Sequence, residues 1–271
     1  MIECKGLNKS FKVAKRNAGL REAVKALFKK EYTYVHALRD VSFTVRDGEM
    51  IGYIGPNGAG KSSTIKIMSG ILTPDSGECL INGRIPWKDR IAHVREIGVV
   101  FGQRSQLWWD VPVIDSFELI RDIYKVPPDT YTKTFKQLTE LLDISEIVRT
   151  PARQLSLGQR MRCEIAASLL HDPSILFLDE PTNHLDIKYQ LQLMDIVRSL
   201  RLTVVSAIHD LNIAAMYCNK LFVLQNGRII AFGPPKQVLT REFIRQVYEV
   251  EAKLYTDPET GQMHILYESA G

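Results

Sequence analysis

The feature that most constrains the fold of this chain is a glycine-rich turn set between an apolar run and a helical pattern. Residues 55–62 read GPNGAGKS and match the pattern G-x-x-x-x-G-K-S at every fixed position. Residues 50–54 are apolar enough to form a short buried strand, and residues 63–68 are typical of the first turns of a helix. A strand, a tight turn and a helix in this order predict an α/β fold.

The composition of this turn indicates phosphate binding. Glycine lets the backbone fold closely around phosphate groups and turn successive N–H groups inward, and a helix N-terminus adds partial positive charge. Lys61 would reach the outer phosphates of a nucleoside triphosphate, and Ser62 would ligate Mg²⁺. The candidate nucleotide-binding residues of the loop are Gly55, Pro56, Asn57, Gly58, Ala59, Gly60, Lys61, Ser62 and Ser63.

A second apolar run ends in two carboxylates. Residues 175–178 are consecutive apolar residues, as expected of a strand buried on both faces of a parallel sheet, and Asp179 and Glu180 follow them. Ligands bind at the carboxyl ends of the strands in open α/β sheets, so these side chains should lie near the loop. We expect Asp179 to hold Mg²⁺ and Glu180 to orient or deprotonate the attacking water.

Two more polar side chains follow predicted strands. Gln103 comes after the apolar run 97–101, and His209 comes after residues 203–208. On the same sheet edge, His209 would contact the terminal phosphate, and Gln103 would contact Mg²⁺ or the water. The alternative for each residue is a purely structural role.

These motifs, in this order, resemble those of the nucleotide-binding subunit of an ABC transporter. The resemblance extends from about residue 2 to residue 233. The corresponding segments are Walker A (residues 55–63), the glutamine loop (Gln103), the signature (Ser156, Leu157, Gly158 and Gln159), Walker B with the catalytic glutamate (Asp179 and Glu180), the D-loop (Leu185 and Asp186) and the switch histidine (His209).

The resemblance implies a P-loop NTPase core of the RecA-like type, with an antiparallel β subdomain and an inserted α-helical subdomain. We expect the ATPase domain to span residues 1–233, the helical subdomain residues 103–170, and an appended tail residues 234–271. ATP and Mg²⁺ are the implied ligands. Members work as head-to-tail dimers in which each ATP contacts Walker A of one subunit and the signature of the other. The implied partners are therefore a second ATPase subunit, in a homodimer, and the transmembrane permease subunits that the dimer drives.

The signature departs from the usual family pattern at one position. Leu157 stands where the family most often has glycine, whereas Ser156, Gly158 and Gln159 are retained. Leucine adds bulk beside the phosphate, so we expect it to affect the rate of dimer closure more than the activity itself. Similar leucine-containing signatures occur in one branch of the family.

Different parts of the sequence resemble different branches. Up to about residue 181, features such as residues 102–110 and Leu157 resemble the ATPases of drug and polysaccharide exporters. After about residue 182, residues 183–187 and 209–215 resemble the ATPases of iron-chelate, haem or cobalamin importers.

The family's permease is gripped mainly by the helical subdomain and the glutamine loop, which lie on the export-like side of this change. We therefore expect an ATP-hydrolysing motor subunit of an exporter. An importer ATPase is the alternative. A soluble ABC protein acting on ribosomes is a further one, because the pair Asn183-His184 also occurs in such proteins.

An insertion follows the first predicted strand. Residues 12–33 are rich in Lys and Arg and place Leu20, Val24, Leu27 and Phe28 at helical spacing, so we expect a basic amphipathic helix. It would pack on its own domain, or contact the permease or anionic lipid headgroups.

The insertion leaves two candidates for stacking on the adenine ring. Phe11 matches the family by its motif, whereas counting back from Walker A as if there were no insertion reaches Tyr32. We favour Phe11, because the insertion would naturally follow the first strand.

Helical spacing is also legible in the middle and at the end of the chain. We expect helices over residues 114–124, 135–142 and 160–170, and a tail helix over about 236–248 followed by a turn at 257–261 between short strands. Trp108 and Trp109 should be partly exposed, either as local core or as part of the groove for the permease.

Composition bounds location and partners. No apolar run approaches the ~18 residues of a membrane span, and the N-terminus has no signal-peptide pattern. We therefore expect a cytoplasmic protein held on the inner face of the cell membrane through its permease. A net charge of +4 is too small to indicate a nucleic-acid partner. The cysteines at 4, 79, 163 and 218 have no metal-ligand spacing and should be reduced thiols.

Overall fold

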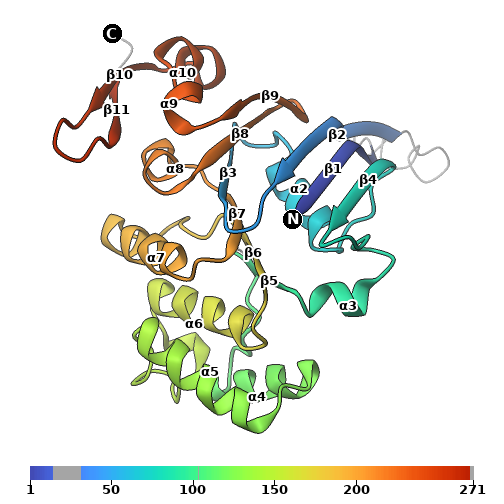
Figure 1. Cartoon of the computed structure of the whole chain (residues 1–271), viewed down its shortest axis with the longest axis vertical. Coiled ribbons are helices and arrows are strands. Elements are labelled where there is room, and N and C mark those ends of the chain that lie inside the picture. The colour runs from blue at the N-terminus through green and yellow to red at the C-terminus, as the bar shows by residue number, and fades with distance from the viewer. Residues whose placement is uncertain (15–31, 103, 269–271) are drawn as a thin grey trace, which may run out of the picture.

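A six-stranded sheet forms the centre of the molecule (Figure 1). The computed structural model describes residues 1–14, 32–102 and 104–268. The strand order is β5-β6-β7-β3-β8-β9, in which the first five strands run parallel and β9 pairs antiparallel with β8. The strands are β3 (Met50–Ile54), β5 (Ile97–Phe101), β6 (Ile175–Asp179), β7 (Thr203–Ala207), β8 (Lys220–Gln225) and β9 (Arg228–Gly233).

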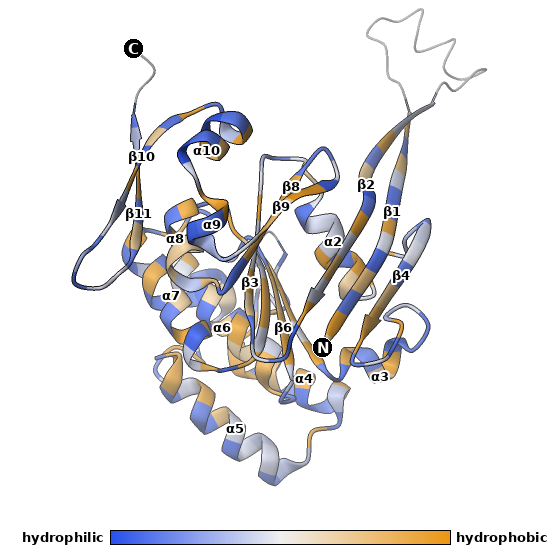
Figure 2. Ribbon diagram, turned by 45° about the horizontal axis from the view of Figure 1, so that its top comes forward, coloured by the Kyte–Doolittle hydropathy of each residue, from blue (hydrophilic) through white to orange (hydrophobic). Residues whose placement is uncertain are grey.

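The parallel strands form where the sequence has apolar runs that can be buried on both faces. Every residue of β3, β6 and β7 is buried. Side chains alternate along β6: Leu176 and Leu178 belong to one hydrophobic cluster, whereas Ile175 and Phe177 belong to another. The central strands are accordingly hydrophobic along most of their length (Figure 2).

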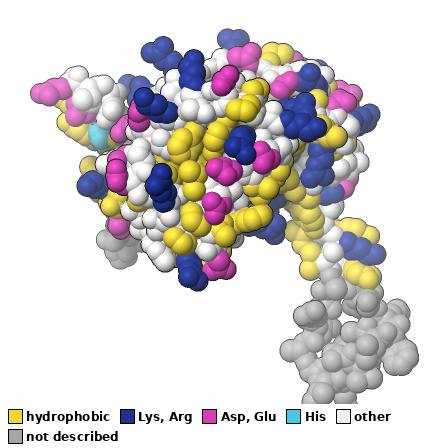
Figure 3. Space-filling view, turned by 90° about the horizontal axis from the view of Figure 1, so that it is seen from below, with side chains coloured by type: hydrophobic (Ala, Val, Ile, Leu, Met, Phe, Trp, Pro, Cys, Tyr) yellow, Lys and Arg dark blue, Asp and Glu magenta, His cyan; other side chains and the backbone are white. Residues whose placement is uncertain are grey.

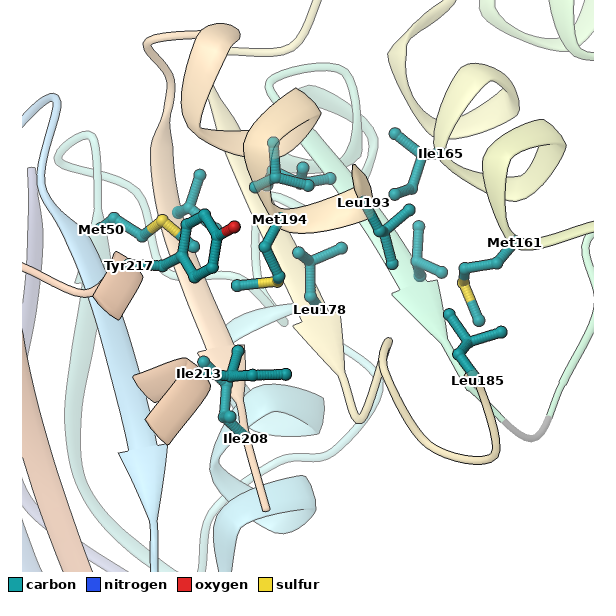
Figure 4. Packing of buried hydrophobic residues seen from close by; sticks show 14 of the residues in the cluster. Met50, Met161, Ile165, Leu178, Leu185, Leu193, Met194, Ile208, Ile213 and Tyr217 are labelled. Carbon is teal, nitrogen blue, oxygen red and sulfur yellow. The ribbon is translucent and has the colours of Figure 1, made fainter. Parts of the chain in front are cut away.

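The first cluster fills the space between the sheet and three helices, α6 (Leu157–Leu169), α7 (Ile187–Ser199) and α8 (Leu211–Tyr217). Leu193 and Met194 of α7 lie over Leu178 of β6 (Figure 4). The Tyr217 hydroxyl donates to the Asp195 carboxylate at 2.9 Å, which ties α8 to α7.

The second cluster lies on the other face of the sheet, around α2 (Lys61–Met68). A three-stranded antiparallel sheet of order β2-β1-β4 covers it. Its strands are β1 (Ile2–Ala14), β2 (Tyr32–Val45) and β4 (Ser76–Ile81), and the short helix α3 (Arg90–Val94) leads into β5. The expected antiparallel β subdomain is therefore present.

The expected helix over residues 12–33 is wrong at both ends. Residues 12–14 extend β1, and residues 32–33 begin β2, with Ala14 opposite Tyr32 in the register. Val13, Tyr32 and Thr33 are β-branched or aromatic residues, which favour strands. Their pairing between β1 and β2 therefore stabilises a hairpin in place of the ends of the predicted helix. The rest of the predicted helix, residues 15–31, lies outside the described residues.

The middle of the chain folds into helices at one end of the central sheet. They are α4 (Val113–Tyr124), α5 (Pro128–Leu141), the 3₁₀ turn η1 (Ala152–Gln154) and the start of α6. Helix α5 begins seven residues before the predicted start at 135, because Pro128 is well suited to a first helical turn. The rings of Phe117 and Phe135 meet edge to face at 6.2 Å and join α4 to α5. All these elements fall inside the window 103–170.

The tail after β9 contains α9 (Pro235–Val238), α10 (Arg241–Tyr248) and a hairpin of β10 (Glu251–Thr256) and β11 (Met263–Glu268). The single predicted helix is divided, because Thr240 caps a new helix by accepting a hydrogen bond from the Phe243 N–H at 3.1 Å. The expected turn forms at Asp257, whose carboxylate accepts from two backbone N–H groups.

This tail is docked firmly on the core. Ile244, Val247 and Ile265 are buried in the first cluster. The Asn212 side chain of α8 makes two hydrogen bonds with the backbone of Ile265, donating to its carbonyl at 3.1 Å and accepting from its N–H at 2.7 Å. The tail is therefore joined to the helix that follows β7.

Among the described residues, no helix is long and apolar enough to cross a membrane. The four cysteines are free and buried, and the sulfurs of Cys4 and Cys79 lie 3.5 Å apart on paired strands.

Tyr53 gives a test of the second cluster. Its ring packs against Phe43 and Phe222, with each pair of centroids 5.6 Å apart, and its buried hydroxyl has no hydrogen-bond partner in the described part of the chain. Tyr53→Phe should raise the free energy of unfolding by about 1 kcal/mol, because it removes an unsatisfied buried polar group. Tyr53→Ala should lower it by about 3–5 kcal/mol. Urea unfolding of both variants checks this, and a destabilised Tyr53→Phe protein would contradict it.

Candidate functional site

The glycine-rich loop follows β3 and leads directly into α2, as its sequence requires. Gly55 and Gly60 have φ angles of 140° and 111°. A Cβ atom on Gly55 would lie 2.0 Å from the Leu224 carbonyl oxygen, and one on Gly60 would lie 2.5 Å from the Ala37 carbonyl oxygen. Only glycine satisfies both the backbone angles and these close approaches. Neighbouring strands therefore hold the loop from two sides.

Lys61 closes the loop on itself. It is 4% exposed, and its Nζ donates to the carbonyls of Gly55 at 2.6 Å and Pro56 at 3.1 Å. Burial lowers the pKa of Lys61, while the carboxylates of Glu180 and Asp179 act in the opposite direction. The loop encloses a small cavity of about 120 Å³, lined by Ala37, Asn57, Gly58, Ala59, Gly60, Lys61, Ser62, Ser63 and Glu180.

Ser62 and Asp179 meet beside this cavity. The Ser62 hydroxyl donates to Asp179 Oδ1 at 2.8 Å. Burial raises the pKa of Asp179, and the hydrogen bond from Ser62 opposes that effect. Neighbouring ligands of octahedral Mg²⁺ lie about 3 Å apart, and Mg²⁺ prefers such oxygens while keeping several waters and phosphate oxygens as its other ligands. These two residues therefore fit a magnesium ion held jointly with a phosphate.

Glu180 follows Asp179 with a left-handed backbone, at φ 59°. Its side chain is held at both oxygens: Oε1 lies 2.7 Å from His209 Nε2, and Oε2 accepts from Asn183 Nδ2 at 2.7 Å. The structure thus brings His209 and Glu180 together, whereas the contact of His209 with a terminal phosphate stays a prediction. It also adds Asn183, whose role sequence analysis missed. Asn183 lies in the turn that begins at Glu180, and its N–H donates to the Glu180 carbonyl at 3.3 Å. No sequence motif predicted this turn.

The four signature residues lie at the N-terminus of α6 and outside the loop cavity. Ser156 and Gln159 form a capping box, in which the Ser156 Oγ accepts from the Gln159 N–H at 3.2 Å and the Gln159 Oε1 accepts from the Ser156 N–H at 2.9 Å. Gly158 is buried against the Tyr189 ring, where a Cβ would lie 3.3 Å from Cγ. One chain alone does not bring the signature to its own loop.

Leu157 faces a separate cavity of about 260 Å³. Other side chains around it include Trp109, Arg160 and the buried Glu164, whose carboxylate accepts from the Gln106 N–H at 3.0 Å. Burial raises the pKa of Glu164. The leucine is thus packed partly toward its own subunit.

Four further candidate residues lie away from the loop cavity or outside the described part of the chain. Asp186 is exposed and precedes α7 as its N-cap residue. Phe11 is half-buried with Lys9 Nζ 5.8 Å from its ring centre, and Tyr32 is 44% exposed with Lys12 Nζ 3.9 Å from its ring centre. Neither ring lines the loop cavity, so the choice between them stays a prediction. Gln103 lies outside the described residues.

Alanine substitutions separate the roles of the loop glycines. Gly58→Ala adds a Cβ with no atom within 4 Å but at a φ of 76°, so it should lower the free energy of unfolding by about 1–2 kcal/mol. Gly55→Ala should lower it by at least about 3 kcal/mol, because its Cβ would also collide with the Leu224 carbonyl. Thermal and urea unfolding measure both, and equal losses would contradict the packing described.

Comparison with known proteins identifies the family. Residues 38–183 match the family described as ABC transporter. The cobalamin import ATP-binding protein BtuD of Halobacterium salinarum is 34% identical over 235 residues, covering 84% of this chain and 59% of that protein. The hemin import ATP-binding protein HmuV of Escherichia coli is 32% identical over 229 residues, covering 81% of this chain and 89% of that protein.

Solved structures agree as well. The dimeric structure of MJ0796, a bacterial ABC transporter cassette, has a TM-score of 0.71 and 25% identity, and the match covers 87% of this chain and 99% of that one. The chain spans 59% of the length of the cobalamin import relative, whereas it spans most of the hemin import relative. The family and the fold class expected from the motifs are thereby confirmed, and this chain belongs to the ABC transporter family.

Proposed function

We propose that this chain is an ATP-hydrolysing motor subunit of an ABC transporter. The observation that carries the proposal is the convergence of four polar side chains beside one phosphate-sized loop: Lys61, Ser62, Asp179 and Glu180. Lys61 would bind the outer phosphates of ATP, and Ser62 and Asp179 would hold Mg²⁺, which would neutralise charge on the phosphates. Glu180 takes a proton from the water whose oxygen attacks the γ-phosphorus, as the bond to the leaving ADP oxygen breaks.

His209 belongs to the same machinery. Its Nε2 lies 2.7 Å from Oε1 of Glu180. A terminal phosphate in the loop offers His209 a second acceptor close to the first, so the histidine links the presence of ATP to the freedom of the general base.

A second subunit is needed to complete the site. Ser156 and Gly158 stand at a helix N-terminus, which suits a phosphate, yet they lie outside their own loop cavity. A head-to-tail dimer supplies the missing signature from the partner. The related cassette MJ0796 is described as dimeric, which supports this arrangement.

Replacing the proposed base tests the reaction. Glu180→Gln keeps the shape of the side chain but cannot take a proton, so ATP turnover should fall at least about 100-fold while an ATP-bound dimer accumulates. Phosphate release and size-exclusion chromatography in ATP and Mg²⁺ measure the two effects. Glu146→Gln is the matched control, because Glu146 is exposed and lies between α5 and η1, away from the loop cavity. Parent-like turnover by Glu180→Gln would refute the assigned role.

The direction of transport follows the permease. The expectation of an exporter rests on residues 102–110 and the leucine signature, and the relatives described above do not support it, since both are named as import ATPases. We therefore favour the importer alternative, with the substrate undefined.

The helical end of the molecule is the proposed contact with the permease. Figure 3 shows this end from the side of α4 and α5, where hydrophobic side chains lie among charged ones. Trp108 and Trp109 are 55% and 50% exposed in the segment leading to α4, as expected from the sequence, and the Arg160 guanidinium lies 5.2 Å from the Trp109 ring centre. Exposed aromatic side chains of this kind often dominate interfaces.

Removing one of these rings tests the contact. Trp108→Ala should weaken co-purification with the permease about tenfold, because a buried interface tryptophan commonly contributes more than 1 kcal/mol, while turnover by the isolated subunit stays near the parent value. Tyr255→Ala, which removes an exposed aromatic ring in the tail hairpin, is the control.

Capture of importer-type and exporter-type permeases of the same organism, side by side, also tests the direction of transport. A preference for the exporter type would overturn the importer proposal.

A further inference from the structure

Asn183 donates a hydrogen bond to one of the two carboxylate oxygens of Glu180, the proposed general base. In the described part of the chain, two side chains hydrogen-bond to Glu180: His209 at Oε1 and Asn183 at Oε2, each at 2.7 Å. The two contacts differ in kind. The amide of Asn183 is a neutral donor, whereas the imidazole of His209 has a second possible acceptor in the phosphate.

The backbone around Glu180 explains why such an anchor is useful. Glu180 sits at the end of β6 in a left-handed conformation, with its N–H donating to the Ala207 carbonyl at 3.2 Å. Its side chain has three rotatable bonds, and its side-chain surface is 21% exposed. A free glutamate there would sample several rotamers, and a general base must stay within hydrogen-bond reach of its water.

We propose that Asn183 is a positioning residue for ATP hydrolysis, a role that rests on the function proposed above. Its Nδ2 holds Oε2 of Glu180, so that Oε1 is the oxygen left to take the proton from water when His209 turns to the phosphate. A neutral donor suits this task, because it orients the carboxylate without supplying the full positive charge that would make it a poor base. In the described part of the chain, Asn183 makes no hydrogen bond to Ser62 or Asp179.

Substitution of Asn183 should change kcat, the KM for ATP and the population of the ATP-bound dimer in an unusual combination. Asn183→Ala should lower kcat about tenfold, with the KM for ATP changed less than twofold, because only the orientation of the base is lost. The ATP-bound dimer should become more populated than in the parent, since hydrolysis is what ends that state. Asn183→Asp has the same shape, lacks the donor and brings a like charge to Oε2, so its kcat should fall at least as far.

A matched control is a residue of α7 that hydrogen-bonds to the same segment. Gln190 of α7 donates from Nε2 to the carbonyls of Thr182 at 3.2 Å and Leu185 at 2.8 Å, and it makes no hydrogen bond to Glu180. Gln190→Ala therefore loosens the segment without freeing the carboxylate. Its kcat should stay within about twofold of the parent.

The full-length chain is used for every variant, with ATP and Mg²⁺ as the probe and the parent and Glu180→Gln proteins run in parallel. Two results together support the positioning role of Asn183. Asn183→Ala has a low kcat and a longer-lived dimer, and Gln190→Ala has a kcat and a dimer close to those of the parent. Parent-like turnover by Asn183→Ala overturns it, as does a joint loss of turnover, dimer and melting temperature, or an equal effect of Gln190→Ala. A parent protein that hydrolyses no more ATP than Glu180→Gln would instead refute the proposed function.

Discussion

The hydrogen bond between Ser62 and Asp179 is the contact on which the site depends. It joins residues 117 positions apart, one at the start of α2 and the other at the end of β6. It can form only if β3 and β6 lie in one parallel sheet, and that sheet exists because its strands are apolar enough to be buried on both faces. Core packing thus determines where a hydroxyl and a carboxylate meet, and their meeting creates a place for a divalent cation.

The polar groups of the site satisfy one another in this structure. Lys61 bonds to carbonyls of its own loop, Ser62 to Asp179, and Glu180 to both His209 and Asn183. Buried polar groups without partners are costly, so these internal bonds keep the site ordered. For Lys61, Ser62 and His209, a phosphate oxygen or a metal ion would be a natural substitute for the present partner, so we expect ligand binding to exchange these bonds with little net loss.

The sequence predicted the strands and the loop, which depend on local residue patterns. It did not predict features that depend on contacts between residues far apart in the chain. The apolar runs identified β3 and β5 at their observed bounds and β6 to within one residue, and the loop motif indicated Lys61 and Ser62, which line the loop cavity. Helical spacing failed at residues 12–14 and 32–33, because pairing across the hairpin outweighs it. The contact of Asn183 with Glu180 was missed because it depends on the left-handed backbone of Glu180. The residue pattern of the sequence does not predict that conformation.

The docking of the tail gives the last residues of the chain a mechanical connection to the reaction. Ile265 is bonded to Asn212, three residues beyond His209, and the Tyr248 phenol, whose pKa burial raises, lies against the backbone amide of Gly55. One appendage outside the sheet thus contacts both the phosphate loop and the segment after His209. On the proposed function, we expect substitutions in the hairpin to change the ATP site, although they lie far from any nucleotide.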